Sequence, residues 1–205
     1  MCIRDSCSTI YAAISRKGDY NLYKSTDAGA TWAPVEDAPK GLMVQRMKYN
    51  GDGKIVLTYA STEGPWNNPR GNGGIRLLNI ADDSITDITP EKNGYGDVVI
   101  DPANPDRMVA VTENVYDQQA NGTFGDDFYV TTDGGKTWKN INLDMTMSGG
   151  DVSWHNESSM HWCSSLAIDP HNTGKIMVVS GNGIFSCDNI WDEHPAFYFL
   201  SLIHI

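Results

Sequence analysis

An eight-residue pattern occurs twice in the chain and constrains its fold more than any other feature. Residues 25–32 read STDAGATW and residues 131–138 read TTDGGKTW, so both follow Ser/Thr-x-Asp-x-Gly-x-Thr-Trp. The Asp carboxylate can accept backbone N–H bonds within a tight turn, and the Gly can adopt a positive φ that a β-carbon would penalise. Thr and Trp favour the strand that follows, and the indole can be buried between sheets. The pattern therefore predicts a hairpin turn between two strands.

The pattern is that of the Asp-box, a turn that recurs in the blades of β-propellers. Two complete copies in one chain favour that fold, whereas the turn itself carries little signal for chemistry. We therefore assign structural, non-catalytic roles to six of its residues: Asp27, Gly29, Trp32, Asp133, Gly135 and Trp138.

A longer internal repeat describes the blade itself. Residues 98–112 and 166–180 align, and each copy reads as a strand, an Asp-Pro turn and a second strand. A further hairpin is predicted for 44–49 and 54–60, with residues 50–53 (NGDG) as its turn. No stretch has convincing helical periodicity. We predict an all-β chain that forms an incomplete β-propeller of about four blades, at roughly 40–50 residues per blade.

Composition limits the partners. The 205 residues suffice for one ordinary domain, and the net charge of −11 argues against a nucleic-acid partner, which needs clustered Lys and Arg. No stretch is long and apolar enough to span a membrane. Beyond Cys2, the cysteines are Cys7, Cys163 and Cys187, whose spacing fits no zinc motif. A Cys163–Cys187 disulfide and two part-buried free thiols on neighbouring strands both fit the sequence.

The two ends of the chain look foreign to the fold. Residues 1–6 (MCIRDS) and 200–205 (LSLIHI) can be encoded by DNA strings that are reverse complements of each other. A sequencing adapter read at both ends of an insert would have this relation. We therefore expect residues 7–199 to form the partial propeller and both hexapeptides to contribute nothing specific to it. The true N-terminus would then be missing, so no signal peptide can be read.

An ordered series of segments, which extends over nearly the whole of 7–199, resembles the xyloglucanases of glycoside hydrolase family 74. The segments are LTYA at 57–60, GP at 64–65, GIRL at 74–77, ITDITP at 85–90, GYGDVVIDP at 94–102, WCSSLAIDP at 162–170 and SGNGI at 180–184. Asp-boxes alone also occur in sialidases, so this order is the more specific signal. Ile85 stands where the family often has Trp, and Cys163–Ser165 depart from its W-M-x-x-L run.

The resemblance implies a fold and an activity. The family pairs two seven-bladed propellers around an open cleft that holds a β-glucan chain. It hydrolyses this chain with inversion by two aspartates, an acid and a base roughly 6.5–9.5 Å apart. Its base motif, R-T-D-x-G-G-A-Y-R-W, and its acid motif, G-D-x-G-G-F, are both absent here. We therefore assign no catalytic residue, and we expect Asp97 and Asp151 to be turn residues.

The expected protein is then a fragment of a secreted hydrolase of xyloglucan or a related β-1,4-glucan, with both catalytic aspartates outside the chain. Its partner would be a polysaccharide, without nucleic acid, membrane, cofactor or metal, and the full-length protein would be a monomer. The glycan and the choice between endo and exo action stay open. An alternative is a non-catalytic Asp-box propeller that binds a glycan or a protein. A sialidase is a further alternative, although no sialidase-type Arg motif is present.

Five residues are candidates for contact with sugar: Trp66, Trp154, His155, His161 and Trp162. The first lies in the polar, Gly-rich stretch 61–74, and the others lie in 149–162 (GGDVSWHNESSMHW). Indole rings can stack on the apolar faces of glucosyl rings, and imidazoles can bond to hydroxyls. Trp162 could also open a strand as a core residue. The two histidines lack a third ligand for a metal.

Overall fold

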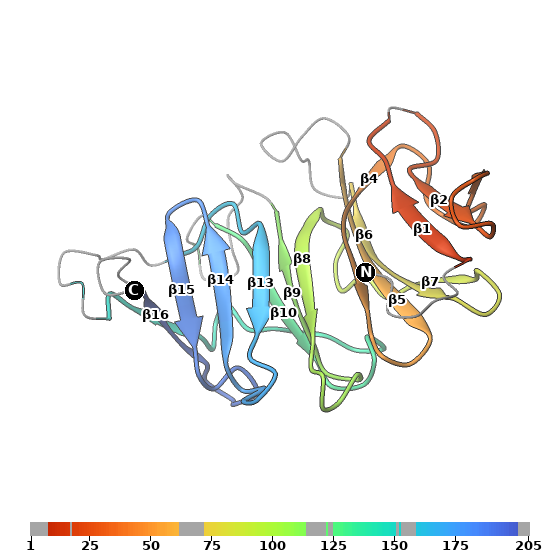
Figure 1. Ribbon diagram of the computed structural model, residues 1–205. Helices are drawn as coiled ribbons and strands as arrows, with labels where there is room; N and C mark the ends of the chain where they lie inside the picture. Colours follow the sequence, from red (N-terminus) through yellow and green to blue (C-terminus); the bar gives the residue numbers. More distant parts are fainter. Residues whose placement is uncertain are drawn as a thin grey trace.

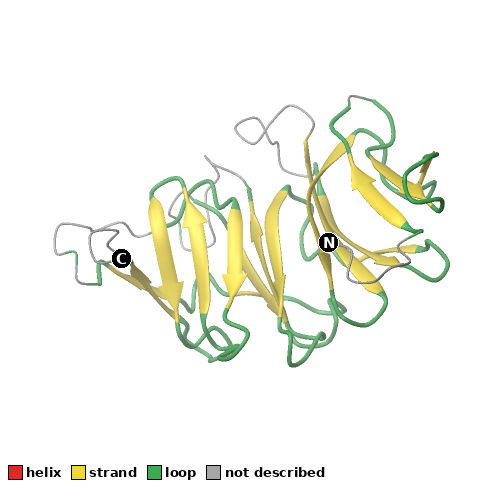
Figure 2. Ribbon diagram, in the orientation of Figure 1, coloured by secondary structure: helices red, strands yellow, loops and turns green. Residues whose placement is uncertain are grey.

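The computed structural model describes residues 8–16, 18–61, 72–113, 122, 125–150, 152 and 159–200. Within these ranges the chain forms strands and turns (Figure 2), and no helix there could cross a membrane. Four sheets follow one another along the chain and stand side by side in an arc (Figure 1). We call them blades I to IV. The prediction of an all-β, incomplete propeller of about four blades is confirmed.

Each blade runs in chain order from its innermost to its outermost strand. Blade I holds β1 (Ile10–Ala13), β2 (Leu22–Ser25) and β3 (Ala33–Pro34). Blade II holds β4 (Leu42–Tyr49), β5 (Lys54–Ser61), β6 (Gly74–Asn79) and β7 (Ile85–Asp87). Blade III holds β8 (Tyr95–Ile100), β9 (Met108–Thr112), β10 (Phe128–Thr131) and β11 (Lys139–Asn140). Blade IV holds β13 (Ser165–Ile168), β14 (Ile176–Ser180), β15 (Gly183–Cys187) and β16 (Ala196–Phe199).

Blade IV has a fifth strand that the sequence did not suggest. Strand β12 (Thr146–Ser148) follows blade III in the chain but pairs in parallel with β16, so that Thr146 lies opposite Ala196. It covers the outer edge of blade IV, which would otherwise present unpaired N–H and C=O groups. The segment that follows blade III therefore pairs with the outermost strand of blade IV.

The predicted hairpin is present as expected. Strands β4 and β5 pair antiparallel up to Tyr49 and Ile55, and residues 50–53 form the turn between them. The Asn50 side-chain oxygen accepts the N–H groups of Asp52 (2.9 Å) and Lys54 (3.1 Å). Asn is favoured in turns because its side chain can make these local bonds.

Apolar side chains fill the spaces between consecutive blades. Blades I and II share a core around Leu22, Leu57 and Leu78. The core between blades II and III includes Val56 and Tyr95. The core between blades III and IV is built by these buried residues: Val99, Val109, Val111, Phe128, Ile141, Met160, Cys163, Leu166, Ile176, Val178, Phe185, Cys187, Ile190 and Phe197. Cys163 and Cys187 are both free thiols within it, so the disulfide alternative is wrong. Both thiols are fully buried, not part-buried as the other alternative expected, and Cys163 precedes β13.

The internal repeat shows how a neighbouring blade covers a strand. Strands β9 and β14 occupy equivalent places in the two repeat copies, so Val109 and Val111 correspond to Met177 and Val179. The first pair is fully buried against blade IV, whereas the second pair is 42% and 44% exposed. The same apolar positions therefore belong to a buried core in blade III and to an exposed apolar face in blade IV.

Asp97 is not a turn residue, and that expectation was wrong. It lies in the innermost strand β8 beside a bulge, and its side chain is completely buried. One carboxylate oxygen accepts the Val98 N–H (2.7 Å) and lies 2.8 Å from Lys48 Nζ of blade II. The other accepts the Leu166 N–H of blade IV (2.7 Å). A single carboxylate thus joins the innermost strands of three blades. Asp151 lies outside the described residues.

The expected foreign ends fall almost wholly outside the described residues. At the C-terminal side, the Leu200 N–H donates to the Ile184 oxygen (2.8 Å), which extends the pairing of β15 with β16 by one residue.

Candidate functional site

The connections that carry the sugar-contact candidates lie at one end of the strands, along one edge of the arc of blades. The innermost strands β4, β8 and β13 begin at this end (Figure 1). Strands β5, β9 and β14 end there, because they pair antiparallel with the innermost strands. We call this end the loop face. By sequence, all five candidates fall in its connections. His161 and Trp162 are described, and the other three, Trp66, Trp154 and His155, lie outside the described residues.

Trp162 is an exposed aromatic residue in a rare backbone conformation. It is 43% exposed, which excludes the core role that the sequence left open. Its φ is +53°, in the left-handed region that bulky side chains seldom adopt. Such a conformation costs about 1–3 kcal/mol and persists only where surrounding contacts hold it, often at functional sites.

The chain before Trp162 is fixed by residues 181 and 182, which lie between β14 and β15. The Gly181 N–H donates to the His161 oxygen (2.6 Å), and the His161 N–H donates to the Asn182 side-chain oxygen (3.3 Å). The ring of Trp162 lies close to Gly181, where an added β-carbon would come within 2.9 Å of Trp162 Cε3. Glycine is therefore required beneath the indole.

The chain after Trp162 is fixed by a buried carboxylate. The Cys163 N–H donates to Asp126 Oδ2 (2.8 Å), and the Thr112 hydroxyl donates to Asp126 Oδ1 (3.1 Å). The Asp126 N–H in turn donates to the Met160 oxygen (2.8 Å). Asp126 is completely buried. Sequence reasoning missed both Asp126 and Asn182, although two consecutive acids directly before an apolar strand were a usable signal.

His161 presents its imidazole to a neighbouring hydroxyl. Its Nε2 lies 3.2 Å from Ser159 Oγ, and the residue is half-buried. Among the described residues, no group of three or more His, Cys, Asp or Glu side chains is arranged to hold a metal ion. The described part of the loop face thus offers an aromatic ring and hydrogen-bonding groups.

Glu113 is a second buried carboxyl group at the loop face. Burial raises the pKa of Glu113 from 4.5 to about 7, the Asp126 charge acts in the same direction, and Arg46 opposes both. Because its folded-state pKa is raised, the protonated form is favoured by folding. The resulting stabilisation is present below pH 4.5 and is lost as the pH rises through 7.

The Asp-boxes lie at the opposite end of the sheets, between β2 and β3 in blade I and between β10 and β11 in blade III. In the first box, Asp27 accepts the Thr31 N–H (2.8 Å) and hydroxyl (2.6 Å), and these bonds lower the pKa of Asp27 to about 2. In the second, Asp133 accepts the same two groups of Thr137 (2.9 and 2.6 Å), with the same effect on its pKa. The glycines have the positive φ that the pattern requires: Gly29 (+93°) and Gly135 (+84°). Both carboxylates are therefore engaged in holding turns.

The two box tryptophans differ. The Trp138 N–H donates to the Ile88 oxygen of blade II (2.7 Å), and its ring packs into the core between blades II and III. Trp32 instead donates to Gly29 of its own turn (3.0 Å) and is 43% exposed. The expected burial of the indole between sheets is thus absent in blade I, where no described blade precedes the box.

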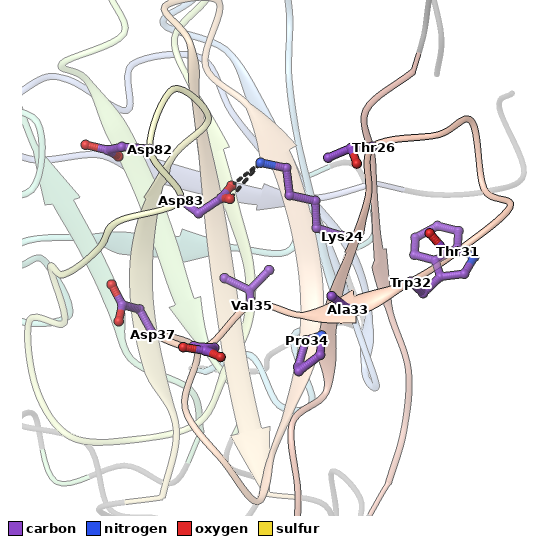
Figure 3. Close-up of a pocket in the computed structure, with 11 residues that line it drawn as sticks. Lys24, Thr26, Thr31, Trp32, Ala33, Pro34, Val35, Asp37, Asp82 and Asp83 are labelled. Atoms are coloured by element: carbon purple, nitrogen blue, oxygen red, sulfur yellow. Dashed lines mark hydrogen bonds and ion pairs between the residues drawn. The ribbon is translucent and has the colours of Figure 1, made fainter.

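Two hollows beside the Asp-boxes follow from the stacking of blades. Figure 3 shows the first, a cavity of about 470 Å³ between Trp32 and the turn of blade II, where Lys24 and Asp83 form an ion pair (2.6 Å). The second, of about 390 Å³, lies between Trp138 and the turn of blade IV that contains Trp191. Each hollow is lined by equivalent residues of its own box. The hollows are therefore features of the repeat.

Comparisons with known proteins agree with this architecture. Residues 129–140 match the BNR/Asp-box repeat. The chain is 29% identical to a xyloglucanase of Acetivibrio thermocellus over 90% of the chain and 24% of the relative. It is also 26% identical to the oligoxyloglucan-reducing end-specific xyloglucanase of Emericella nidulans, over 93% and 32%. It therefore spans about a quarter to a third of the length of these relatives.

Two solved structures have the same arrangement of blades. A family 74 enzyme of Niastella koreensis superposes with a TM-score of 0.84 at 34% identity, over 94% of this chain and 28% of that one. The family 74 xyloglucanase of Xanthomonas campestris superposes with a TM-score of 0.78 at 28% identity, with the same coverage. Together with the Asp-boxes and the four stacked sheets, these likenesses show that the chain is a partial Asp-box β-propeller of glycoside hydrolase family 74.

Proposed function

We propose that residues 7–199 are the middle part of a secreted glycoside hydrolase that acts on xyloglucan or a related β-1,4-glucan. The reaction would proceed by inversion, with both catalytic aspartates outside this chain. The relatives named as xyloglucanases support this assignment. The role of the chain itself would be to bind part of the polysaccharide along its loop face, as a monomeric unit without cofactor.

The observation that carries the proposal is the exposed, backbone-fixed indole of Trp162 on the loop face. A rigid aromatic ring offers a flat apolar surface to the apolar face of a sugar ring at little cost in conformational entropy. His161 lies next to it on the same segment. Trp66, Trp154 and His155 belong to the same set of connections by sequence, and we propose that they extend the binding surface.

Two of the described carboxylates near this segment, Asp97 and Asp126, suit structural roles. Asp126 and Asp97 are completely buried and each accepts a backbone N–H from the start of blade IV. A catalytic acid or base must reach the glycosidic oxygen or a water beside it. These contacts favour the placement of both catalytic groups elsewhere in the longer protein.

The test is a calorimetric titration of the chain with a xyloglucan oligosaccharide. We expect weak, salt-insensitive binding that falls in Trp162→Ala and in Trp154→Ala. Trp32→Ala is the matched control, because Trp32 is equally exposed but lies at the Asp-box end. Absence of binding, or an equal loss in Trp32→Ala, would contradict the proposed binding surface.

A reducing-sugar assay tests the placement of the catalytic groups. The chain should release no more reducing ends from xyloglucan or mixed-linkage glucan than a heat-killed sample does. Turnover above that level that disappears in Asp97→Ala or Asp151→Ala would place a catalytic acid inside this chain and overturn this part of the proposal.

A further inference from the structure

The backbone on both sides of Trp162 is held by partners from different connections. The Gly181 N–H bonds to the His161 oxygen, which belongs to the peptide unit that precedes Trp162. The Cys163 N–H bonds to Asp126 Oδ2 and belongs to the peptide unit that follows it. Because peptide units are planar, restraining the units on both sides of a residue limits both its φ and its ψ. These two bonds therefore favour the left-handed conformation of Trp162.

Asp126 is suited to hold the second peptide unit. Its carboxylate is fully buried, and its second oxygen is occupied by the Thr112 hydroxyl (3.1 Å). Its own N–H is bound to the Met160 oxygen (2.8 Å), so the residue cannot turn away without breaking bonds to two connections. A hydrogen bond to an ionised carboxylate is shorter and stronger than a neutral one. The bond from the Cys163 N–H to the Asp126 carboxylate thus stabilises the left-handed conformation of Trp162, which a bulky residue seldom adopts.

We propose that Asp126 is a positioning residue: it fixes the peptide unit between Trp162 and Cys163 and thereby orients the exposed indole toward a ligand. The ligand class, a β-linked glucosyl chain stacked on the indole, rests on the function proposed above. The positioning of the ring by Asp126 is independent of that function and is tested separately.

Asp97 provides the matched control. It is as deeply buried as Asp126, and it also accepts a backbone N–H from the start of blade IV, that of Leu166. Its remaining partners lie in β4 and β8, and one of them, Arg46, also donates to the Ser164 oxygen (2.6 Å). Asp126, by contrast, bonds directly to the peptide unit that follows Trp162. Loss of a buried carboxylate should therefore destabilise the chain in either place, but only a change at Asp126 should move the indole.

The first experiment uses 19F NMR of the full chain labelled with 5-fluorotryptophan, in which Trp162→Phe identifies the Trp162 line. We expect this line to shift in Asp126→Ala and to broaden or shift less in Asp126→Asn, whose neutral amide can still accept the Cys163 N–H. The line of Trp138, which is anchored in the core between blades II and III, should stay in place. Asp97→Asn should leave the Trp162 line unchanged. If Asp126→Ala does not fold, Asp126→Asn decides. A Trp162 line that does not respond to Asp126, or that responds equally to Asp97→Asn, overturns the proposal.

The second experiment measures affinity for a xyloglucan oligosaccharide in the same variants. We expect Asp126→Ala and Trp162→Ala each to weaken binding about tenfold, the value of one stacking contact. The double variant should be no weaker than either single one, because Asp126 acts through Trp162. Additive losses would contradict positioning. If the unaltered chain binds no oligosaccharide, the proposed function falls, while the NMR experiment still decides the role of Asp126.

Discussion

The carboxylate of Asp97 should contribute more to stability than any exposed ion pair of the chain. Asp97→Ala would leave the buried N–H groups of Val98 and Leu166 without their acceptor and would remove the ion-pair partner of Lys48. An unsatisfied buried donor costs about 1–3 kcal/mol, and breaking a buried charge pair typically costs about 3–5 kcal/mol. Because Lys48 is partly exposed and can be rehydrated, we expect a total loss of about 3–5 kcal/mol in the free energy of unfolding. Natural domains have only about 5–15 kcal/mol of stability, so this is a large fraction.

Urea unfolding monitored by circular dichroism measures the loss, and amide hydrogen exchange of Leu166 locates it. Asp188→Ala is the control, because Asp188 forms an exposed ion pair with Lys175 (3.3 Å), and such pairs contribute about 0–1 kcal/mol. If Asp97→Ala destabilises the chain no more than Asp188→Ala does, or leaves the exchange of Leu166 unchanged, the carboxylate does not join the blades as described.

Three further predictions concern the blade interfaces, the loop face and the open face. Gly135→Ala should lower the urea midpoint more than Gly51→Ala does. Both glycines have φ +84°, but a β-carbon at Gly135 would come within 2.9 Å of blade II, whereas Gly51 faces open space. Equal losses would contradict the close packing of the box against blade II. Glu113→Gln should flatten the dependence of stability on pH. The free energy of unfolding of the unaltered chain should fall by about 3 kcal/mol between pH 4.5 and pH 8, because the buried carboxyl ionises over this range. Parallel pH profiles of the two proteins would argue against the raised pKa of Glu113. Met177→Lys changes the open apolar face of blade IV and should reduce self-association in sedimentation velocity. Leu143→Lys changes an isolated exposed leucine and should not reduce it. Equal effects of the two substitutions would mean that the open face of blade IV does not mediate self-association.

The sequence by itself determined the turns and the blade repeat of this protein. The Asp-box is local: Asp27 bonds to Thr31, four residues ahead, and the Gly29 N–H bonds to the Ser25 hydroxyl, four residues behind. Bonds this close in the chain join residues of one turn, so the residue types within the turn are enough to predict them. The strand–turn–strand repeat was predictable for a related reason, because alternation and turn residues act within a few positions.

Only the tertiary structure decided the roles of Asp97, Trp32 and Trp162. Asp97 accepts an N–H from a residue 69 positions away, so nothing near it in sequence distinguishes it from a turn residue. Trp32 is exposed and Trp138 is packed although their local sequences match, because burial depends on whether another blade stands beside the box. Trp162 is exposed because bonds from two other connections hold it in a left-handed conformation that its own sequence disfavours. Contacts between segments distant in sequence have no local signature, and for that reason the fold could be predicted from the sequence while the geometry of the site could not.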